Sequence, residues 1–173
     1  MDKSKFKKIL FKVAFCAMAC DGDIDPREIE ELKLMDKNTT YFADIDLSDE
    51  LEDLVADFKN KGAKVIEELF ELLRNTKLNP IQELLVLEVA LRIVNADERI
   101  DENEVKFVNF LRSKLDLHDE VIIDRFGELD ILYTNEYSKN INIKGKEEDF
   151  TKSIHLPELE ELKEINLKDE KES

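Results

Sequence analysis

Apolar residues recur at helical spacing along most of the chain, and short polar segments interrupt them. Such runs cover residues 4–20 and 26–36, and the polar segment 38–48 follows them. Apolar residues three and four positions apart form one face of an α-helix, whereas a half-buried strand alternates with period two. The spacing therefore predicts a helix over each run and a loop after the second.

The same pattern predicts five further helices. They cover residues 48–59 with Ser48 as the N-cap, then 63–75 after a break at Gly62, and then 81–96, 102–115 and 117–129. The helix at 81–96 follows Asn79-Pro80-Ile81-Gln82, which combines a capping residue, proline at the first helical position and glutamine at the third. It is apolar around most of its circumference, so we expect it to be the buried central helix of a bundle.

Beyond about Thr134 the chain becomes polar and weakly patterned. We divide the sequence into a helical domain at 1–136 and a peripheral C-terminal extension at 137–173. A short leucine-bearing helix is expected in the extension, docking on the bundle through four apolar residues, Leu156, Leu159, Leu162 and Ile165. The charged last residues have the composition of a disordered tail.

Composition and charge narrow the class of protein. The chain has 173 residues with only 4 glycines and 3 prolines, which suits an all-α protein with a real core. Its 42 acidic and 26 basic residues give a net charge of −16. A field of that sign repels phosphate backbones and anionic lipid headgroups, so we expect no nucleic-acid binding and no direct membrane insertion. It attracts cations or a basic partner protein, although acidity often serves solubility alone.

The first twenty residues have the features of an export signal, with a lysine-rich start, an apolar run and the sequence AMAC. Lys12 interrupts the run, and the segment has an internal counterpart that cannot be a signal, so we expect a cytoplasmic protein. Cys16 and Cys20 lie in this stretch, and with only His118 and His155 elsewhere they cannot build a structural zinc site. We interpret both cysteines as small buried residues in a reduced compartment.

A shift of 76 positions, from Asp21 to Asp97, aligns the sequence with itself. The segment FKVAFCAMACDGDIDPREIEELKLM then matches LEVALRIVNADERIDENEVKFVNFL, and both contain the spacing D-x-x-I-D-x-x-E. Each copy has the pattern of a helix, a short acidic loop and a second helix. We therefore predict a helical bundle built from two helix–acidic loop–helix repeats.

Helix capping explains four of the repeated acids. Asp25 and Glu28 have the spacing of a capping box, and Asp101 and Glu104 have it in the second copy. Such a cap stabilises a helix by about 1 kcal/mol and needs no ligand.

Capping does not explain Asp21 and Asp97. Each follows an apolar helix whose C-terminal dipole disfavours an anion, so an acid at this place in both copies indicates that something positive lies nearby. A divalent cation held by Asp21, Asp25 and Glu28 would compensate the negative charge of the first loop. Oxygen ligands without histidine or thiolate select Ca²⁺, Mg²⁺ or Mn²⁺.

The sequence DGDIDPRE matches the second half of an EF-hand calcium loop. The first two ligand positions of such a loop fall on Ala17 and Ala19, and in the second copy on Ile93 and Asn95. A standard EF-hand is therefore excluded. Any ion would be held by few protein ligands and hence weakly.

These motifs resemble the tellurite-resistance TerB family over about residues 5–130. The resemblance rests on ACDGDIDPREIEEL after an apolar helix and on NADERIDENEVKFVNFL in the second unit, where Glu98 replaces the family glycine. It implies an all-helical domain, related to the N-terminal domain of some membrane-anchored DnaJ-like co-chaperones. It also implies links to tellurite and oxyanion resistance, phage and colicin resistance, and membrane-associated stress complexes. Metal binding is proposed for the family's acidic positions, which here are Asp21, Asp25, Glu28, Asp97, Asp101 and Glu104.

Nothing in the sequence indicates an enzyme, since a Gly-rich phosphate loop, a His-anchored nucleophile and a Glu-x-x-His pair are all absent. We expect no catalytic residues and no resident cofactor beyond a divalent cation. Two hypotheses remain: a cation-responsive stress-response module that acts through a protein partner, basic or membrane-associated, and a constitutive acidic adaptor whose loop acids are helix caps. Asp21→Asn separates them, because it removes ion binding only under the first hypothesis.

Overall fold

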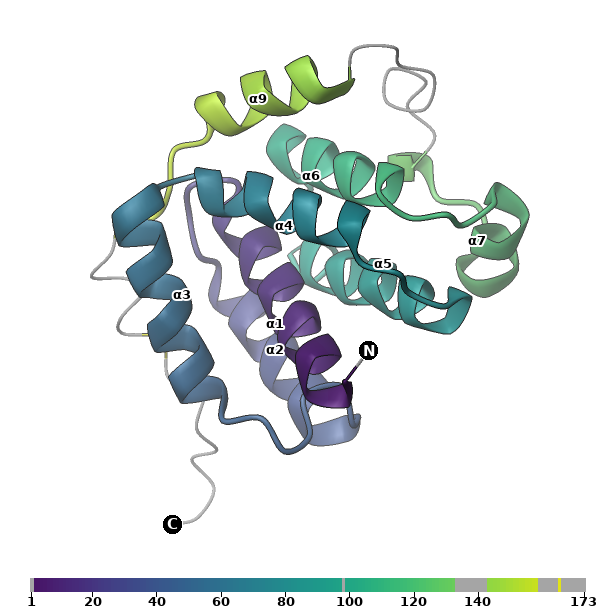
Figure 1. Ribbon diagram of the computed structural model, residues 1–173, viewed down its shortest axis with the longest axis horizontal. Helices are drawn as coiled ribbons and strands as arrows, with labels where there is room; N and C mark the ends of the chain where they lie inside the picture. The colour runs from purple at the N-terminus through teal and green to yellow at the C-terminus, as the bar shows by residue number, and fades with distance from the viewer. Residues whose placement is uncertain (1, 98, 133–142, 159–164, 166–173) are drawn as a thin grey trace.

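The computed structural model describes residues 2–97, 99–132, 143–158 and 165, and these residues form a helical bundle (Figure 1). Over this part of the chain there are eight α-helices, one short 3₁₀ turn and no strand. The helices are α1 (Lys3–Ala19), α2 (Pro26–Asn38), α3 (Leu47–Lys61), α4 (Lys64–Asn75), α5 (Pro80–Val94), α6 (Glu102–Ser113), α7 (Asp119–Phe126) and α9 (Ile143–Ser153), and the turn η1 covers Asp130–Leu132. The predicted all-α class is confirmed.

Helices α1 and α5 form the centre of the core. They lie side by side, and α2, α3, α4 and α6 pack around them (Figure 1). Phe11 and Phe15 of α1 and Val89 and Ala90 of α5 are fully buried. A helix that is apolar on most sides is stable only where its neighbours cover those sides. Helix α5 is thus buried as its sequence predicts, and α1 shares the centre with it.

Helix α1 contains the residues that have the features of an export signal. Ala17, Met18 and Ala19 are fully buried, so this segment is part of the core. Cys16 and Cys20 are free thiols and also buried, as predicted. Burial raises the pKa of Cys16 to about 12 and that of Cys20 well above its ordinary value, which keeps both thiols protonated and unreactive. In the described part of the chain, no helix combines the length and the apolar character that crossing a bilayer requires.

Side-chain caps set where the helices begin. At the start of α5 the Asn79 side chain accepts a hydrogen bond from the Gln82 amide at 2.8 Å, and the Gln82 side chain accepts one from the Asn79 amide at 3.0 Å, as predicted. The expected cap of α3 was wrong. Asp46 caps this helix instead of Ser48, accepting from the amides of Ser48 and Asp49 at 3.0 and 3.2 Å, and aspartate is as good an N-cap as serine.

The C-terminal extension contains helix α9, which lies earlier in the chain than the leucine-bearing segment where a helix was expected. Phe150 of α9 and Ile154 just after it are buried against the bundle. Tertiary packing therefore stabilises a helix that its polar sequence signals weakly. Of the four apolar residues expected to dock, Leu156 and Ile165 pack against the core. The other two, Leu159 and Leu162, lie outside the described residues. The expected disordered tail also lies outside the described residues.

A core substitution tests this packing. Phe107 of α6 is fully buried, and its ring centroid lies 5.8 Å from that of Phe70 in α4. We expect Phe107→Ala to lower the free energy of unfolding by about 3–5 kcal/mol, because the lost ring leaves a cavity that the neighbours fill incompletely. Chemical denaturation measures the loss. Ile81→Ala is the control, since Ile81 is 72% exposed and should change stability by less than about 0.5 kcal/mol. Equal losses in both variants would contradict the assignment of the core.

Candidate cation site at the two acidic loops

Four helix ends meet where the two acidic loops lie against each other. The loop at 20–25 joins α1 to α2, and the loop at 95–101 joins α5 to α6. The Asn103 side-chain amide donates to the Cys20 carbonyl oxygen at 3.1 Å, and Arg27 at the start of α2 donates to Asp97 of the second loop at 2.9 Å. The structure therefore brings together two motifs that are 76 positions apart in the sequence.

Both predicted capping boxes form. Asp25 accepts a hydrogen bond from the Arg27 amide at 2.8 Å, while Glu28 Oε1 accepts one from the Asp25 amide at 3.0 Å. In the second loop Glu104 Oε1 accepts from the Asp101 amide at 2.9 Å, and Asp101 caps α6. These four acids cap the N-termini of α2 and α6, as helix capping alone predicts.

Glu28 and Glu104 differ from ordinary capping residues in their burial. Glu28 is 1% exposed and Glu104 is 2% exposed. Each uses Oε1 for its cap, and the buried Oε2 atom of each has no hydrogen-bond partner in the part of the chain that the structure describes. Loss of hydration, together with the charges of neighbouring carboxylates, raises the pKa of Glu28 to about 9 and that of Glu104 to about 7, and Glu104 is one of the charges that act on Glu28. The two loops thus hold a pair of buried, protonatable acids.

Asp21 lies beside this pair. Its Oδ1 accepts a hydrogen bond from the Asp23 amide at 3.0 Å, and the residue is half-buried. Burial raises the pKa of Asp21, and the charges of Asp101 and Asp23 raise it further. Among the described residues no ion pair to Asp21 is formed, so its negative charge is not compensated there.

Asp97 has the positive neighbour that its sequence position predicts. The Arg27 guanidinium pairs with Asp97 at 2.9 Å and with Asp25 at 3.1 Å, which bridges the two loops. The hydrogen bonds from Arg27 lower the pKa of Asp25 to about 2. An internal cation therefore already occupies one side of the acidic cluster.

The six predicted metal ligands supply the donor atoms that a cation needs, but their side chains are not placed around a common point. All six supply oxygen, which hard divalent cations prefer, and two of them carry buried oxygens without a partner. Within residues 2–97, 99–132, 143–158 and 165, however, no three His, Cys, Asp or Glu side chains stand close enough together to hold a metal ion. These side chains would have to come closer together to complete a coordination shell.

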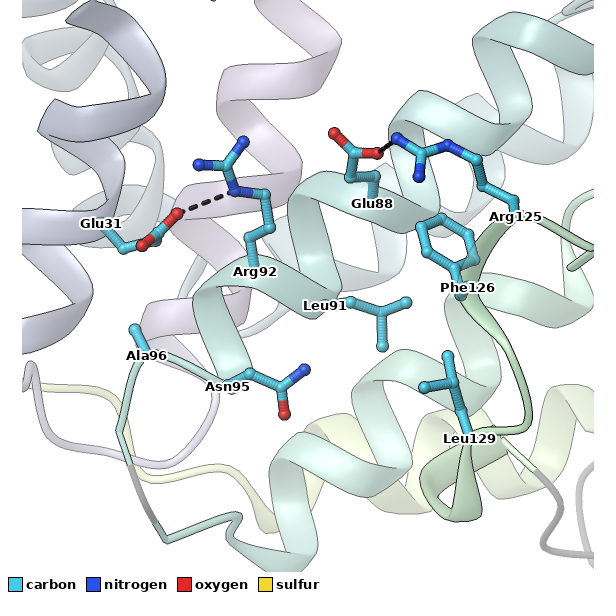
Figure 2. Close-up of a pocket in the computed structure, with 9 residues that line it drawn as sticks. All are labelled: Glu31, Glu88, Leu91, Arg92, Asn95, Ala96, Arg125, Phe126 and Leu129. Atoms are coloured by element: carbon cyan, nitrogen blue, oxygen red, sulfur yellow. Dashed lines mark hydrogen bonds and ion pairs between the residues drawn. The ribbon is translucent and has the colours of Figure 1, made fainter. Parts of the chain in front are cut away.

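A second feature lies away from the loops and was missed by the sequence reasoning. A hollow of about 450 Å³ lies over the outer face of α5, between α2 and α7 (Figure 2). Arg92 pairs with Glu31 at 2.8 Å, and Arg125 pairs with Glu88. The remaining lining residues are Leu91, Asn95, Ala96, Phe126 and Leu129. Its signal in the sequence is the pair of charged residues, Glu88 and Arg92, one turn apart in the apolar part of this helix.

The fold and the loops define a class of protein, an all-helical domain with acidic loops between its core helices. A family model described as "Tellurite resistance protein TerB" matches residues 9–124 of the 173-residue chain. The chain belongs to the TerB family, as the motifs predict. No curated protein and no solved structure gives a significant match. The family match includes both acidic loops and ends before the C-terminal extension.

The buried pair makes stability depend on pH. Folded Glu28 and Glu104 keep their protons up to pH values of about 9 and 7, whereas the unfolded chain loses them near pH 4.5. The folded state therefore binds more protons across this range, and the free energy of unfolding falls as the pH rises through it.

We expect Glu28→Gln and Glu104→Gln to raise the free energy of unfolding by about 1–3 kcal/mol at pH 8.5 and to change it little at pH 4, because glutamine keeps the cap and cannot ionise. Urea denaturation at several pH values measures this. Glu30→Gln, an exposed position on the same helix, is the matched control and should follow the wild-type pH profile. Parallel pH profiles for all four proteins would show that the pair does not titrate in this way.

Proposed function

We propose that this TerB-family protein is a non-catalytic stress-response module whose two acidic loops together bind one divalent cation. The observation that carries the proposal is the pair of buried glutamates, one in the first turn of the helix after each loop, whose Oε2 atoms have no partner among the described residues. A buried carboxylate without a partner costs free energy, and a divalent cation is the ligand that would remove this cost. Family membership supports a role in tellurite or general stress resistance.

The two loops form one site in this proposal rather than one site each. Glu28 and Glu104 provide the inner oxygens, and Asp21 and Asp101, whose charges act on the same region, lie next to them. The internal repeat explains the symmetry of this arrangement, since each copy brings the same acid–acid–glutamate spacing to the junction. The proposed ion is Ca²⁺, Mg²⁺ or Mn²⁺, because all the donors are oxygen.

Binding is expected to be weak, with a Kd on the order of 10⁻⁴ M or above, for two reasons. Protons compete for Glu28 and Glu104, whose pKa values are raised. Arg27 competes for Asp25 and Asp97 through its ion pairs. A site of this strength responds to changes in cation concentration instead of holding a permanent structural ion.

The cation would act on a protein partner through the helices that meet at the site. Neutralising the carboxylates removes repulsion between the ends of α2 and α6, so their relative positions can change. The partner is basic or membrane-associated, because the chain carries a net charge of −16. A cytoplasmic location is part of the proposal.

A constitutive acidic adaptor is the second candidate function. It is favoured by the complete capping boxes at α2 and α6, and by the spacing of the described acids, which are not arranged around a common point. In that case the loop acids begin helices and the acidic surface alone recruits a partner.

Calorimetric titration of the metal-stripped protein with Ca²⁺, Mg²⁺ and Mn²⁺ separates the two functions. We expect saturable binding of at least one ion, tighter at pH 8.5 than at pH 7 because protons leave the glutamates. Glu28→Gln and Glu104→Gln should abolish it, and Asp21→Asn should weaken it at least tenfold. The matched control Glu30→Gln should bind like the wild type. If titration of the wild type gives no saturable binding at either pH value, the cation hypothesis is wrong and the adaptor function remains.

Arg27 gives an independent prediction. Arg27→Gln should tighten cation binding severalfold, because it frees Asp25 and Asp97 from their ion pairs. Arg99→Gln is the charge-matched control, since Arg99 lies in the second loop and, among the described residues, makes no ion pair that bridges the loops. Titration of both variants with the same ion gives the comparison. An equal gain in both would mean that only net charge, and not the bridge, limits binding.

A further inference from the structure

Helix α9 packs against both α4 and α6 (Figure 1). The surface of α4 and α6 that α9 covers is called the α4–α6 groove. Its buried positions are Glu147, Phe150 and Thr151, followed by Ile154 just beyond its end. They follow the i, i+3, i+4, i+7 spacing of one helical face. The neighbouring residues Glu148, Asp149 and Lys152 are exposed, so a single face of α9 makes the contact.

The polar part of the contact is a buried ion pair. Glu147 pairs with Lys114, the residue directly after α6, and lies 3.8 Å from Arg74 of α4. The Lys114 side chain is only 2% exposed, and its Nζ lies 5.7 Å from the centroid of the Phe70 ring. Two positive charges on the walls of the groove thus meet one acid on the helix. Arg74 also pairs with Glu71 of its own helix at 3.0 Å, so Glu147 serves above all as the counter-charge of Lys114.

The apolar part of the contact lies one turn further along α9. The Phe150 ring stacks on Phe110 of α6 with 5.4 Å between centroids. Next to it the Thr151 hydroxyl donates to the Glu67 carboxylate of α4. The groove therefore recognises an acid, an aromatic ring and a hydroxyl in a fixed order on one helical face.

The segment after α9 reaches the first acidic loop. Gly22 has a φ of +85°, and a Cβ atom there would lie 2.4 Å from the carbonyl oxygen of His155. Only glycine combines this backbone conformation with so close an approach. The end of the α9 segment is thereby positioned against the loop.

The α4–α6 groove and helix α9 come from different parts of the chain. The groove residues Glu67, Phe70, Arg74, Phe110 and Lys114 all lie inside the family match at 9–124, whereas α9 lies outside it. The domain thus builds a helix-binding surface that a segment beyond the domain fills.

We propose that the α4–α6 groove is a binding site for a helix of a partner protein, and that α9 occupies it as an intramolecular ligand. The partner helix carries the α9 pattern, Glu-x-x-Phe-Thr-x-x-Ile, or close substitutes. Its acid is required by the two basic residues of the groove, and its aromatic residue by Phe110. Partner binding exchanges one helix for another in the same contacts.

Exchange is feasible because α9 gains its stability from the groove. A helix of 11 residues is marginal in water, so α9 depends on tertiary contacts to stay folded. Its covalent connection gives α9 an effective concentration on the order of 1 mM. A partner helix that makes better contacts with the groove displaces α9 at a concentration below this value. The α9 segment thus sets the threshold for partner binding.

A peptide with the sequence of residues 143–158, labelled with fluorescein, is the probe. Its binding to the full-length chain is measured by fluorescence anisotropy in EDTA, which makes the result independent of the proposed cation site. We expect Phe150→Ala and Glu147→Ala, which weaken the intramolecular contact in two different ways, to bind the peptide at least tenfold more tightly than the wild type. Glu148→Ala is the matched control, because Glu148 is adjacent and exposed, and it should behave like the wild type.

The groove itself is tested in the Phe150→Ala chain. Adding Lys114→Glu should weaken peptide binding at least tenfold, and a peptide carrying Glu147→Lys should regain most of it. Circular dichroism establishes that each chain is folded. If the folded Phe150→Ala and Glu147→Ala chains bind the peptide no better than the wild type, or if Lys114→Glu has no effect, α9 is a permanent part of the fold and the proposal is wrong.

Discussion

The packing of α1 against α5 is the constraint on which the rest of the structure depends. Both helices are apolar on most sides, so each must be covered by neighbours, and side by side they cover each other. The contacts between their following loops show that both helices end in the same region. The pairing of two buried helices therefore brings the two acidic loops together, and it turns two separate sets of helix caps into one cluster of carboxylates.

That cluster contains an electrostatic conflict. The N-termini of α2 and α6 favour acids, whereas the C-termini of α1 and α5 and the burial of Glu28 and Glu104 disfavour them. The chain relieves the conflict in two ways, through the Arg27 bridge and through the raised pKa values of the two glutamates. A divalent cation would act on the same carboxylates. Each glutamate uses one oxygen for its cap, and its other oxygen has no hydrogen-bond partner among the described residues.

The α9 segment adds to the family domain a contact that this chain makes for itself. A buried ion pair at Glu147 and a stacked ring at Phe150 attach α9 to the groove, and the His155 carbonyl oxygen then lies against Gly22. The α4–α6 groove and the first acidic loop are therefore connected by a short stretch of backbone.

The sequence by itself determined the helical class, the buried character of 81–96, the capping boxes and membership of the TerB family, because periodicity, caps and motifs are local signals that short segments carry. It did not determine that Glu28 and Glu104 would be buried as a pair, that Arg27 would pair with Asp97, or that α9 would fold in a polar stretch. Each of these depends on contacts between residues far apart in the chain, and burial, partial charge and pKa follow from those contacts. Only the tertiary structure decided them, because a carboxylate has the same local pattern whether it faces water or another carboxylate.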